Sequence, residues 1–179
     1  MKKPDRPPAS AKRPAKRILG RRERVGLPAL GLAAIEAKVD TGAYTSAIHC
    51  QDVHLATDPA TGQPVLHVRL LDPEHPATDG RPLTFKEFTR RDIRSSNGEV
   101  QARYVIRTVV RLYGQEFAAE FSLADRSDMR HPVLLGRRLL RQGRFVVDVA
   151  RRDVSYKAEQ RAAAAPLQPG LPTQGPRGA

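Results

Sequence analysis

The sequence predicts an all-β domain, a barrel or sandwich of short strands with one short helix near its C-terminal end. Apolar and polar residues alternate with the period of a half-buried strand, as in 35–40 and 65–71. Turn-forming residues separate such segments, as in Ser95-Ser96-Asn97-Gly98. One segment, 137–142, combines strong helix formers with a stop signal at Gly143. Many short strands with one helix are typical of all-β barrels and sandwiches.

The expected elements follow one another along the middle of the chain. Extended segments are expected over 35–40, 47–55, 65–71, 83–93, 100–112, 116–123, 145–149 and 153–156. The proline-containing stretch 72–82 is expected to be a loop. Tyr113-Gly114-Gln115 is expected to form the turn of a hairpin between the two longest strands.

Length and composition indicate one folded domain between two polar termini. The chain of 179 residues suffices for a single domain. Residues 1–17 hold seven Lys and Arg against one acid and lack hydrophobic periodicity, so we expect a disordered basic arm. Residues 158–179 begin with an Ala-rich stretch, where a helical turn is expected, and continue as a flexible Pro- and Gly-rich tail. The folded domain is therefore expected over 18–157.

The formal net charge of +12 favours acidic partners. The middle of the chain, 18–157, contributes +5, because it holds 22 basic and 17 acidic residues, and the arm is more strongly basic. A basic arm is suited to RNA, a ribosome surface, an anionic membrane or an acidic peptide. The alternative is a solvated tail that only aids solubility.

Cysteine content and hydropathy favour a cytoplasmic protein. The single cysteine, Cys50, allows no intrachain disulfide and is expected to be a small buried residue. The sequence has no run of about 18 apolar residues, so we expect no membrane span and no membrane partner. The start Met-Lys-Lys leads into no apolar segment of the kind that a secretory signal contains.

The segment Asp40-Thr41-Gly42-Ala43 is the best candidate for chemistry. Asp40 ends a strand whose apolar residues lie on the opposite face, so its carboxylate sits on a turn over an apolar floor. Gly42 permits a sharp turn and lets its amide approach the carboxylate, and Thr41 supplies a hydroxyl group. The apolar residues of this strand are Ile35, Ala37 and Val39.

Asp-Thr-Gly-Ala after a strand, with an apolar-Gly-helix segment far downstream at 134–140, resembles the retropepsin-type aspartic peptidases. More specifically, five stretches are similar to a bacterial retropepsin-like family often labelled ATP-dependent zinc proteases, namely 20–28, 37–43, 96–98, 103–106 and 131–140. The resemblance spans most of 20–148. It implies an acid-protease barrel, closed or partly open, in which Ala43, Leu135 and Gly136 support the catalytic loop.

The resemblance implies an aspartic-type endopeptidase. Such enzymes use two carboxylates that share one proton, because adjacent like charges resist joint ionisation. One acts as base on a water molecule and the other as acid toward the peptide. This chain has a single Asp-Thr-Gly, so we expect a homodimer that pairs two Asp40 residues, each with its Thr41 and Gly42.

The resemblance also implies a β-hairpin flap over the site. Ser96, Asn97 and Gly98 are the candidate tip, because an Asn-Gly turn here joins two extended segments. An ordinary exposed turn is the alternative. Arg103, on the strand that follows, is a candidate for orienting an acidic substrate, and a plain surface residue is the alternative.

Neither a metal nor a nucleotide cofactor is expected, despite the family label. The sequence lacks the Gly-x4-Gly-Lys-Ser/Thr loop that cradles phosphates and the His-Glu-x-x-His pattern of zinc peptidases. His49, Cys50 and His54 form the nearest cluster. On a strand, His49 and Cys50 point to opposite faces and make a poor pair of ligands.

Two functions remain open. The first is a dimeric aspartic endopeptidase acting on acidic, for example glutamate-rich, peptide, since the chain is basic and this family is associated with glutamate-ligase systems. The second is a non-catalytic retropepsin-like binding module, recruited to ribosome or RNA through the basic arm. Aromatic residues make up only 5% of the chain and Trp is missing, so RNA-stacking features are sparse.

Overall fold

The computed structural model describes residues 15–94 and 98–165. The expectations for an arm over 1–14 and a tail over 166–179 lie outside this range, as do Ser96 and Asn97 of the expected flap tip. Arg17, expected to belong to the arm, is the first residue of a strand. No helix among the described residues has the length and apolar character that a membrane span requires.

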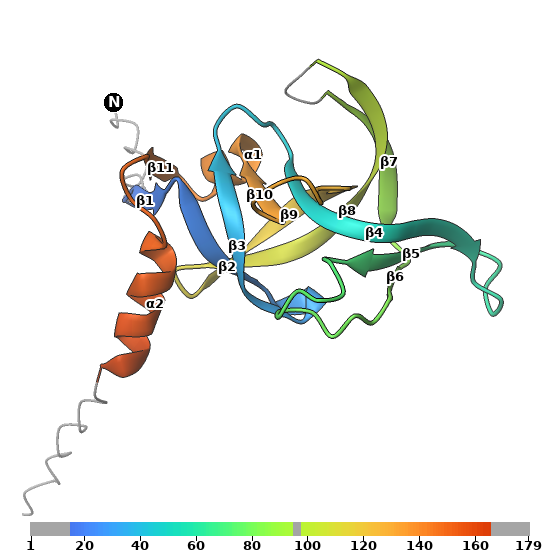
Figure 1. Cartoon of the computed structure of the whole chain (residues 1–179), viewed down its shortest axis with the longest axis horizontal. Helices are drawn as coiled ribbons and strands as arrows, with labels where there is room; N and C mark the ends of the chain where they lie inside the picture. Colours follow the sequence, from blue (N-terminus) through green and yellow to red (C-terminus); the bar gives the residue numbers. More distant parts are fainter. Residues whose placement is uncertain (1–14, 95–97, 166–179) are drawn as a thin grey trace, which may run out of the picture.

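Six strands close into a barrel, as Figure 1 shows. The last barrel strand along the chain, residues 133–136, closes the ring. It pairs in parallel with the strand that ends at Asp40 and antiparallel with the strand that begins at Ser46. The narrowest contact in the ring is a single pair, Gly26 with Arg111. In ring order the strands are β10 (Val133–Gly136), β3 (Leu32–Asp40), β2 (Arg22–Leu27), β8 (Val100–Leu112), β9 (Gln115–Ala124) and β4 (Ser46–Thr57). The predicted all-β barrel is confirmed.

Three further strands extend the barrel sheet. β5 (Pro64–Leu70) pairs with β4, and β6 (Leu83–Phe85) pairs with β5. β7 (Phe88–Arg94) pairs with β8 to form a hairpin that curves away from the barrel in Figure 1. A short 3-10 helix, η1 (Pro28–Leu30), joins β2 to β3.

The barrel interior is apolar and continuous. The predicted inner face of β3 is confirmed, because Ile35, Ala37 and Val39 are all buried. Phe121 and Leu135, from two other barrel strands, are fully buried against the same core. Burial of each such large side chain stabilises the fold by about 1.5–3 kcal/mol, so the core can hold the loops at its ends in place.

The predicted hairpin between the two longest strands is confirmed. Leu112 pairs directly with Gln115, which leaves Tyr113 and Gly114 as a two-residue turn. Both turn residues have positive φ, 55° and 68°. Turns with two positive φ angles match the right-handed twist of the flanking strands, and glycine adopts this conformation at low cost.

The C-terminal end differs from the expectation. β11 (Phe145–Asp148) forms as predicted and pairs in parallel with β1 (Arg17–Gly20), but the strand expected over 153–156 is wrong, because α2 (Val154–Ala164) begins there. The fully buried Glu23 carboxylate accepts the backbone N–H groups of Val154 and Ser155, both at 3.0 Å. A carboxylate at this position satisfies N–H groups that the first turn of a helix leaves free, which favours a helix start over a strand. The short helix predicted after Gly136 is confirmed as α1 (Arg137–Gln142).

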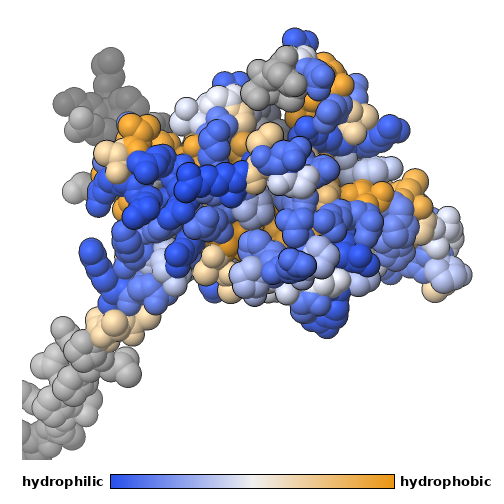
Figure 2. Space-filling view, in the orientation of Figure 1, coloured by the Kyte–Doolittle hydropathy of each residue, from blue (hydrophilic) through white to orange (hydrophobic). Residues whose placement is uncertain are grey.

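Hydrophobic side chains reach the surface where β1 and β11 lie. Figure 2 shows apolar colour there, as it does in a few other areas of a face that is mostly hydrophilic. Ile18, Val146 and Val149 are 39%, 44% and 73% exposed. Contiguous exposed apolar residues often mark interaction surfaces.

Candidate active site

The Asp40 carboxylate sits at the end of β3 on a tight, hydrogen-bonded turn. Its Oδ1 atom accepts the backbone N–H groups of Gly42 at 2.9 Å and of Ala43 at 3.1 Å. The Lys38 ammonium lies 3.6 Å from Oδ2. The side chain is 27% exposed, so the carboxylate is held in one orientation and still accessible to a substrate.

Gly136 lies beside Asp40 because β10 runs parallel to β3 in register, pairing Leu135 with Val39 and Gly136 with Asp40. The Gly136 N–H donates to the buried Ser46 hydroxyl at 3.0 Å. A Cβ atom at Gly136 would lie 2.6 Å from the backbone carbon of Thr45. Only glycine allows so close an approach of two backbone segments.

The first turn of α1 ties the candidate catalytic loop to the barrel. The Arg137 N–H donates to the Ala43 carbonyl at 2.8 Å, and the Arg138 N–H donates to the Tyr44 carbonyl at 3.2 Å. The Arg137 guanidinium also lies over the Tyr44 ring, 5.5 Å from its centroid. The structure therefore brings together the predicted loop residues, Asp40 to Ala43, and their predicted supports, Leu135 and Gly136.

The outer side of the loop is open. Thr41 and Gly42 are exposed, and Tyr44 is 55% exposed. Thr41 lines a hollow of about 530 Å³ together with Arg137 and Val146. Among the described residues, the Asp40 carboxylate is in contact with two backbone amides and one ammonium group, and with no second carboxyl group.

The predicted flap residues are only partly described. β7 and β8 pair as far as Arg94 and Val100, so the hairpin that was expected from the Asn-Gly turn forms. Gly98 has a φ of 90°, whereas Ser96 and Asn97 lie outside the described residues. In Figure 1 the end of β7, the start of β8 and the β3–β4 loop lie at the same end of the molecule.

Arg103 lies on β8, in the stem of the hairpin, and is not in contact with Asp40. Its Nε and Nη2 atoms donate to the Gln101 side-chain oxygen at 3.3 and 2.8 Å. It lines a separate hollow with Cys50 and Asp125. The substrate-orienting role of Arg103 stays a prediction, as does the plain surface role.

A partly buried glutamate, Glu120, links the hairpin to α1, and sequence reasoning missed it. Glu120 on β9 is only 7% exposed in its side chain and binds Arg91 on β7 at 2.7 Å. It also contacts Arg107 on β8 at 3.4 Å and Arg138 on α1. No local pattern signals this cluster, because its members come together only when β7, β8 and β9 pair and α1 is in place.

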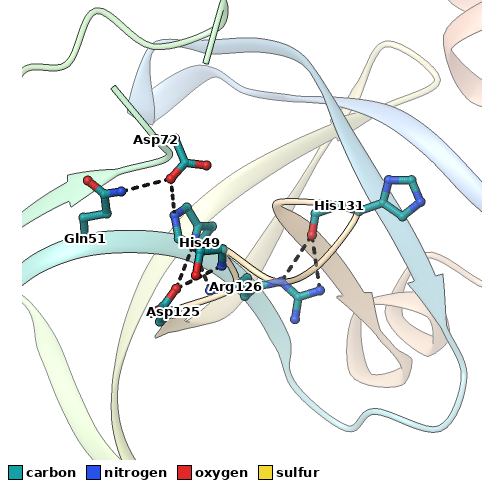
Figure 3. A network of polar contacts seen from close by, with 7 residues as sticks. His49, Gln51, Asp72, Asp125, Arg126 and His131 are labelled. Carbon is teal, nitrogen blue, oxygen red and sulfur yellow. Dashed lines mark hydrogen bonds and ion pairs between the residues drawn. The ribbon is translucent and has the colours of Figure 1, made fainter. Parts of the chain in front are cut away.

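A second network surrounds His49, as Figure 3 shows. The His49 ring is buried and points toward Asp72, with its Nε2 atom 3.1 Å from Oδ1. Its Nδ1 atom accepts the backbone N–H of Arg126 at 2.8 Å, so the second nitrogen must carry the proton that reaches Asp72. Sequence reasoning considered His49 only as a metal ligand, and its actual partners lie 23 and 77 residues away.

The cluster that was weighed as a zinc site is dispersed. Cys50 is buried, as predicted, and burial raises the pKa of its thiol to about 12. His54 packs against His67, with ring centroids 5.1 Å apart. Within 15–94 and 98–165, His, Cys, Asp and Glu side chains form no group of three or more that could hold a metal ion.

A small closed barrel with Asp-Thr-Gly at a strand end, and an apolar-Gly strand beside it, defines the class of retropepsin-type acid-protease domains. The chain belongs to the RimB-like family, described as "Retropepsin-like aspartic endopeptidase RimB", whose model matches residues 18–158. The expected family relationship is confirmed.

Longer proteins contain a related segment. A protein from Shewanella halifaxensis named "Probable alpha-L-glutamate ligase" is 40% identical over 124 residues, which are 67% of this chain and 26% of that protein. One of the same name from Desulfotalea psychrophila is 34% identical over 140 residues, 76% of this chain and 29% of that protein. The chain thus spans about a quarter of the length of the curated relatives it matches.

A solved structure shares the fold. The crystal structure of Lpg0085, a Legionella pneumophila protein of unknown function, matches with a TM-score of 0.62 at 21% sequence identity. The match covers 79% of this chain and 99% of that one.

Proposed function

We propose that the protein is an aspartic-type endopeptidase that hydrolyses acidic, glutamate-rich peptides, with water activated by two Asp40 residues of a homodimer. The observation that carries the proposal is the Asp40 carboxylate, which is oriented by two amides at an open strand end. Membership of a family described as an aspartic endopeptidase supports the same reaction.

The chemistry needs one carboxylate and one carboxylic acid. The ionised Asp40 takes a proton from water while the water oxygen attacks the peptide carbonyl carbon. The protonated Asp40 of the second copy then gives its proton to the leaving amide nitrogen as the C–N bond breaks. Two such groups close together share one proton, which keeps one in each state.

The exposed side of the loop is suited to a second copy of the chain. Thr41 is exposed there and lines the same hollow as Val146. Ile18 pairs with Val146 across β1 and β11, and both side chains are partly exposed. Burying these apolar groups in a dimer would stabilise the dimer by about 25 cal/mol for each Å² of apolar surface.

The substrate class follows from charge and from the relatives. A net charge of +12 attracts acidic peptides. Relatives of this segment occur within longer proteins named probable α-L-glutamate ligases. A hydrolase for glutamate-rich chains is the chemical counterpart of a ligase that adds glutamate.

Cleavage of a glutamate-rich peptide by the wild type and by Asp40→Asn, measured from pH 4 to 8, tests the reaction. We expect Asp40→Asn to lose at least 100-fold in rate with an unchanged fold, because the amide cannot act as a base. Asp79→Asn, at an exposed loop carboxylate, is the matched control and keeps full activity. Equal cleavage by Asp40→Asn would refute the proposal, and loss of activity with a chelator would show a metal requirement. If neither the wild type nor the variants cleave the peptide, the alternative of an RNA- or ribosome-binding module is favoured.

Sedimentation equilibrium combined with activity tests the dimer. Val146→Asp places a charge on the proposed interface and should yield an inactive monomer. Leu55→Asp is the control, because Leu55 is 55% exposed on β4 and lines none of the hollows around the Asp40 loop. A wild type that is a strict monomer and fully active would contradict the paired Asp40 mechanism.

A further inference from the structure

A second cleft lies on the barrel, and none of the residues of the Asp40 turn line it. It has a volume of about 680 Å³ and is bordered by the start of β3, the loop after β5 and the loop that joins β9 to β10. Charged and imidazole side chains line much of it, namely Glu36, His49, Asp72, His75, Arg126 and Arg130.

The carboxylates of this cleft already have partners. Glu36 binds the Arg22 guanidinium at 2.8 Å and lies 3.5 Å from the His131 ring. Asp72 binds the His49 ring at 3.1 Å and accepts the Gln51 amide at 2.9 Å. Neither acid is therefore free to neutralise the arginines of the cleft.

The Arg126 guanidinium lacks a carboxylate partner of this kind. Its Nε and Nη2 atoms each lie 3.3 Å from the backbone carbonyl of His131. Within the described parts of the chain, no carboxylate lies at ion-pair distance from it. Burial lowers the pKa of Arg126, nearby Arg103 lowers it further, and Asp40 raises it, so both of these charges act on the guanidinium. A guanidinium has five N–H donors, which leaves donors for an incoming carboxylate.

The backbone under Arg126 is fixed by a buried side chain. The Arg126 N–H donates to His49 Nδ1 at 2.8 Å, and the His49 backbone N–H donates to the Pro132 carbonyl at 2.7 Å. His49 is only 1% exposed. Figure 3 shows how this ring lies between Asp72 and the loop. The loop that carries Arg126 is thus held in place before any ligand arrives, which lowers the entropy cost of binding.

We propose that this cleft is the subsite for an acidic side chain of the substrate, with Arg126 as the cation that receives its carboxylate and Arg130 as a second cation on the same loop. The inference rests on the proposed function, because it names the residue that would give the peptidase its preference for acidic peptides. The loop continues directly into β10, whose last residue lies beside Asp40. A peptide engaged at both places would therefore be aligned along the barrel between them.

Binding of end-blocked pentaglutamate to full-length Asp40→Asn protein, measured by calorimetry at low salt, tests the inference without cleavage. Adding Arg126→Gln should weaken binding at least 10-fold. Arg161→Gln removes the same charge from the exposed end of α2 and should leave the affinity within 2-fold. End-blocked pentaglutamine should bind neither protein. Equal affinities of the Arg126→Gln and Arg161→Gln proteins would overturn the inference.

A second measurement guards against a folding defect in Arg126→Gln. In Asp40→Asn protein that is otherwise unchanged, pentaglutamate should shift the imidazole NMR signals of His49 and His75, which line the cleft, and leave that of His67 in place. Unshifted His49 and His75 signals would overturn the inference, as would an oligouridine RNA that displaces the peptide at equal concentration.

The two proposals fail in different ways. Binding through Arg126 by a wild type that cleaves nothing would leave the subsite standing and refute the peptidase. Cleavage of pentaglutamate at an unchanged rate and KM in Arg126→Gln would leave the peptidase standing and refute the subsite.

Discussion

Asp40 and Gly136 end two parallel strands side by side and in register, although 95 residues separate them in the chain. A Cβ atom at Gly136 would overlap the Thr45 backbone carbon and oxygen, at 2.6 and 2.7 Å. The strand that supports the candidate catalytic loop can approach it only because no side chain intervenes.

We predict that Gly136→Ala lowers the free energy of unfolding by about 2 kcal/mol or more, since backbone rather than a flexible side chain must move. Gly26→Ala is the control: its new Cβ would lie 3.3 Å from the Nε and Nη2 atoms of the flexible Arg111 side chain and 3.5 Å from the Arg111 Cβ atom, with no backbone atom in the way. Urea denaturation measures both. A Gly136→Ala protein as stable as Gly26→Ala would show that the Thr45 backbone can yield.

Glu120→Gln should destabilise the protein by about 1–3 kcal/mol at pH 7, because three arginines lose a charged acceptor that is nearly buried. The hydrogen bond from Arg91, above all, lowers the pKa of Glu120 below 4.5. The stabilising contribution of ionised Glu120 is therefore fully present above the pKa of this residue in the unfolded chain. It is lost as the pH falls through its pKa in the folded protein. Denaturation at pH 7 and pH 3 should show the difference from wild type shrinking in acid.

Glu116→Gln is the matched control for this cluster, because Glu116 is exposed on the same strand. It should leave stability within about 0.5 kcal/mol of wild type at both pH values. A loss equal to that of Glu120→Gln would attribute the effect to net charge rather than to the arginine cluster.

Glu23→Gln should destabilise the protein by about 1–3 kcal/mol, because one of the oxygens that accept the Gly20, Val154 and Ser155 N–H groups becomes an amide donor. Burial raises the pKa of Glu23 above 4.5, against the opposing effect of these hydrogen bonds. Because the folded pKa exceeds the unfolded one, this stabilising contribution is complete below pH 4.5 and declines as pH rises through the folded pKa.

The gap in stability between wild type and Glu23→Gln should therefore be wider at pH 4.5 than at pH 7. Chemical denaturation across this range measures it, with the exposed Glu74→Gln as control. A gap that narrows in acid would mean that Glu23 is ionised more readily in the fold than in the unfolded chain.

Cys50 should be inert toward thiol reagents in the native protein. Burial raises the pKa of its thiol from 9.0 to about 12, which reduces the thiolate fraction about 1,000-fold at pH 8. Reaction with Ellman's reagent should be fast in guanidinium and at least 1,000-fold slower without it. Rapid native labelling would reveal local opening around β4.

The sequence predicted the parts of the fold that local physics decides. Alternation placed Asp40 at a strand end opposite Ile35 and Val39. Tyr113-Gly114-Gln115 predicted a hairpin turn, which the structure narrows to Tyr113 and Gly114. The prediction of a strand over 153–156 was wrong, because the helix that forms there starts on the Glu23 carboxylate, 131 residues away from Val154. No pattern in a single segment could indicate that contact.

The candidate site likewise has one part that the sequence predicted and one part that it did not. The turn from Asp40 to Ala43 has its hydrogen bonds within four residues, so the motif predicted its geometry. The role proposed for Arg126 could not be predicted from the sequence, because the proposal rests on what surrounds this residue: a buried histidine from β4 and acids already paired with other groups. Which side chains are buried, and which distant residues they pair with, is visible only in the folded chain.

The double pairing of β10 affects the order of events during synthesis. The Asp40 turn is completed only when residues 133–138 insert beside β3 and β4, so nearly the whole domain must leave the ribosome first. Contacts of such long sequence separation form late, because the intervening chain must close a large loop. A nascent or truncated chain that stops before Val133 has the Asp-Thr-Gly sequence without the β10 and α1 contacts that hold its loop. Any activity of this loop is therefore delayed until synthesis of the domain is almost finished.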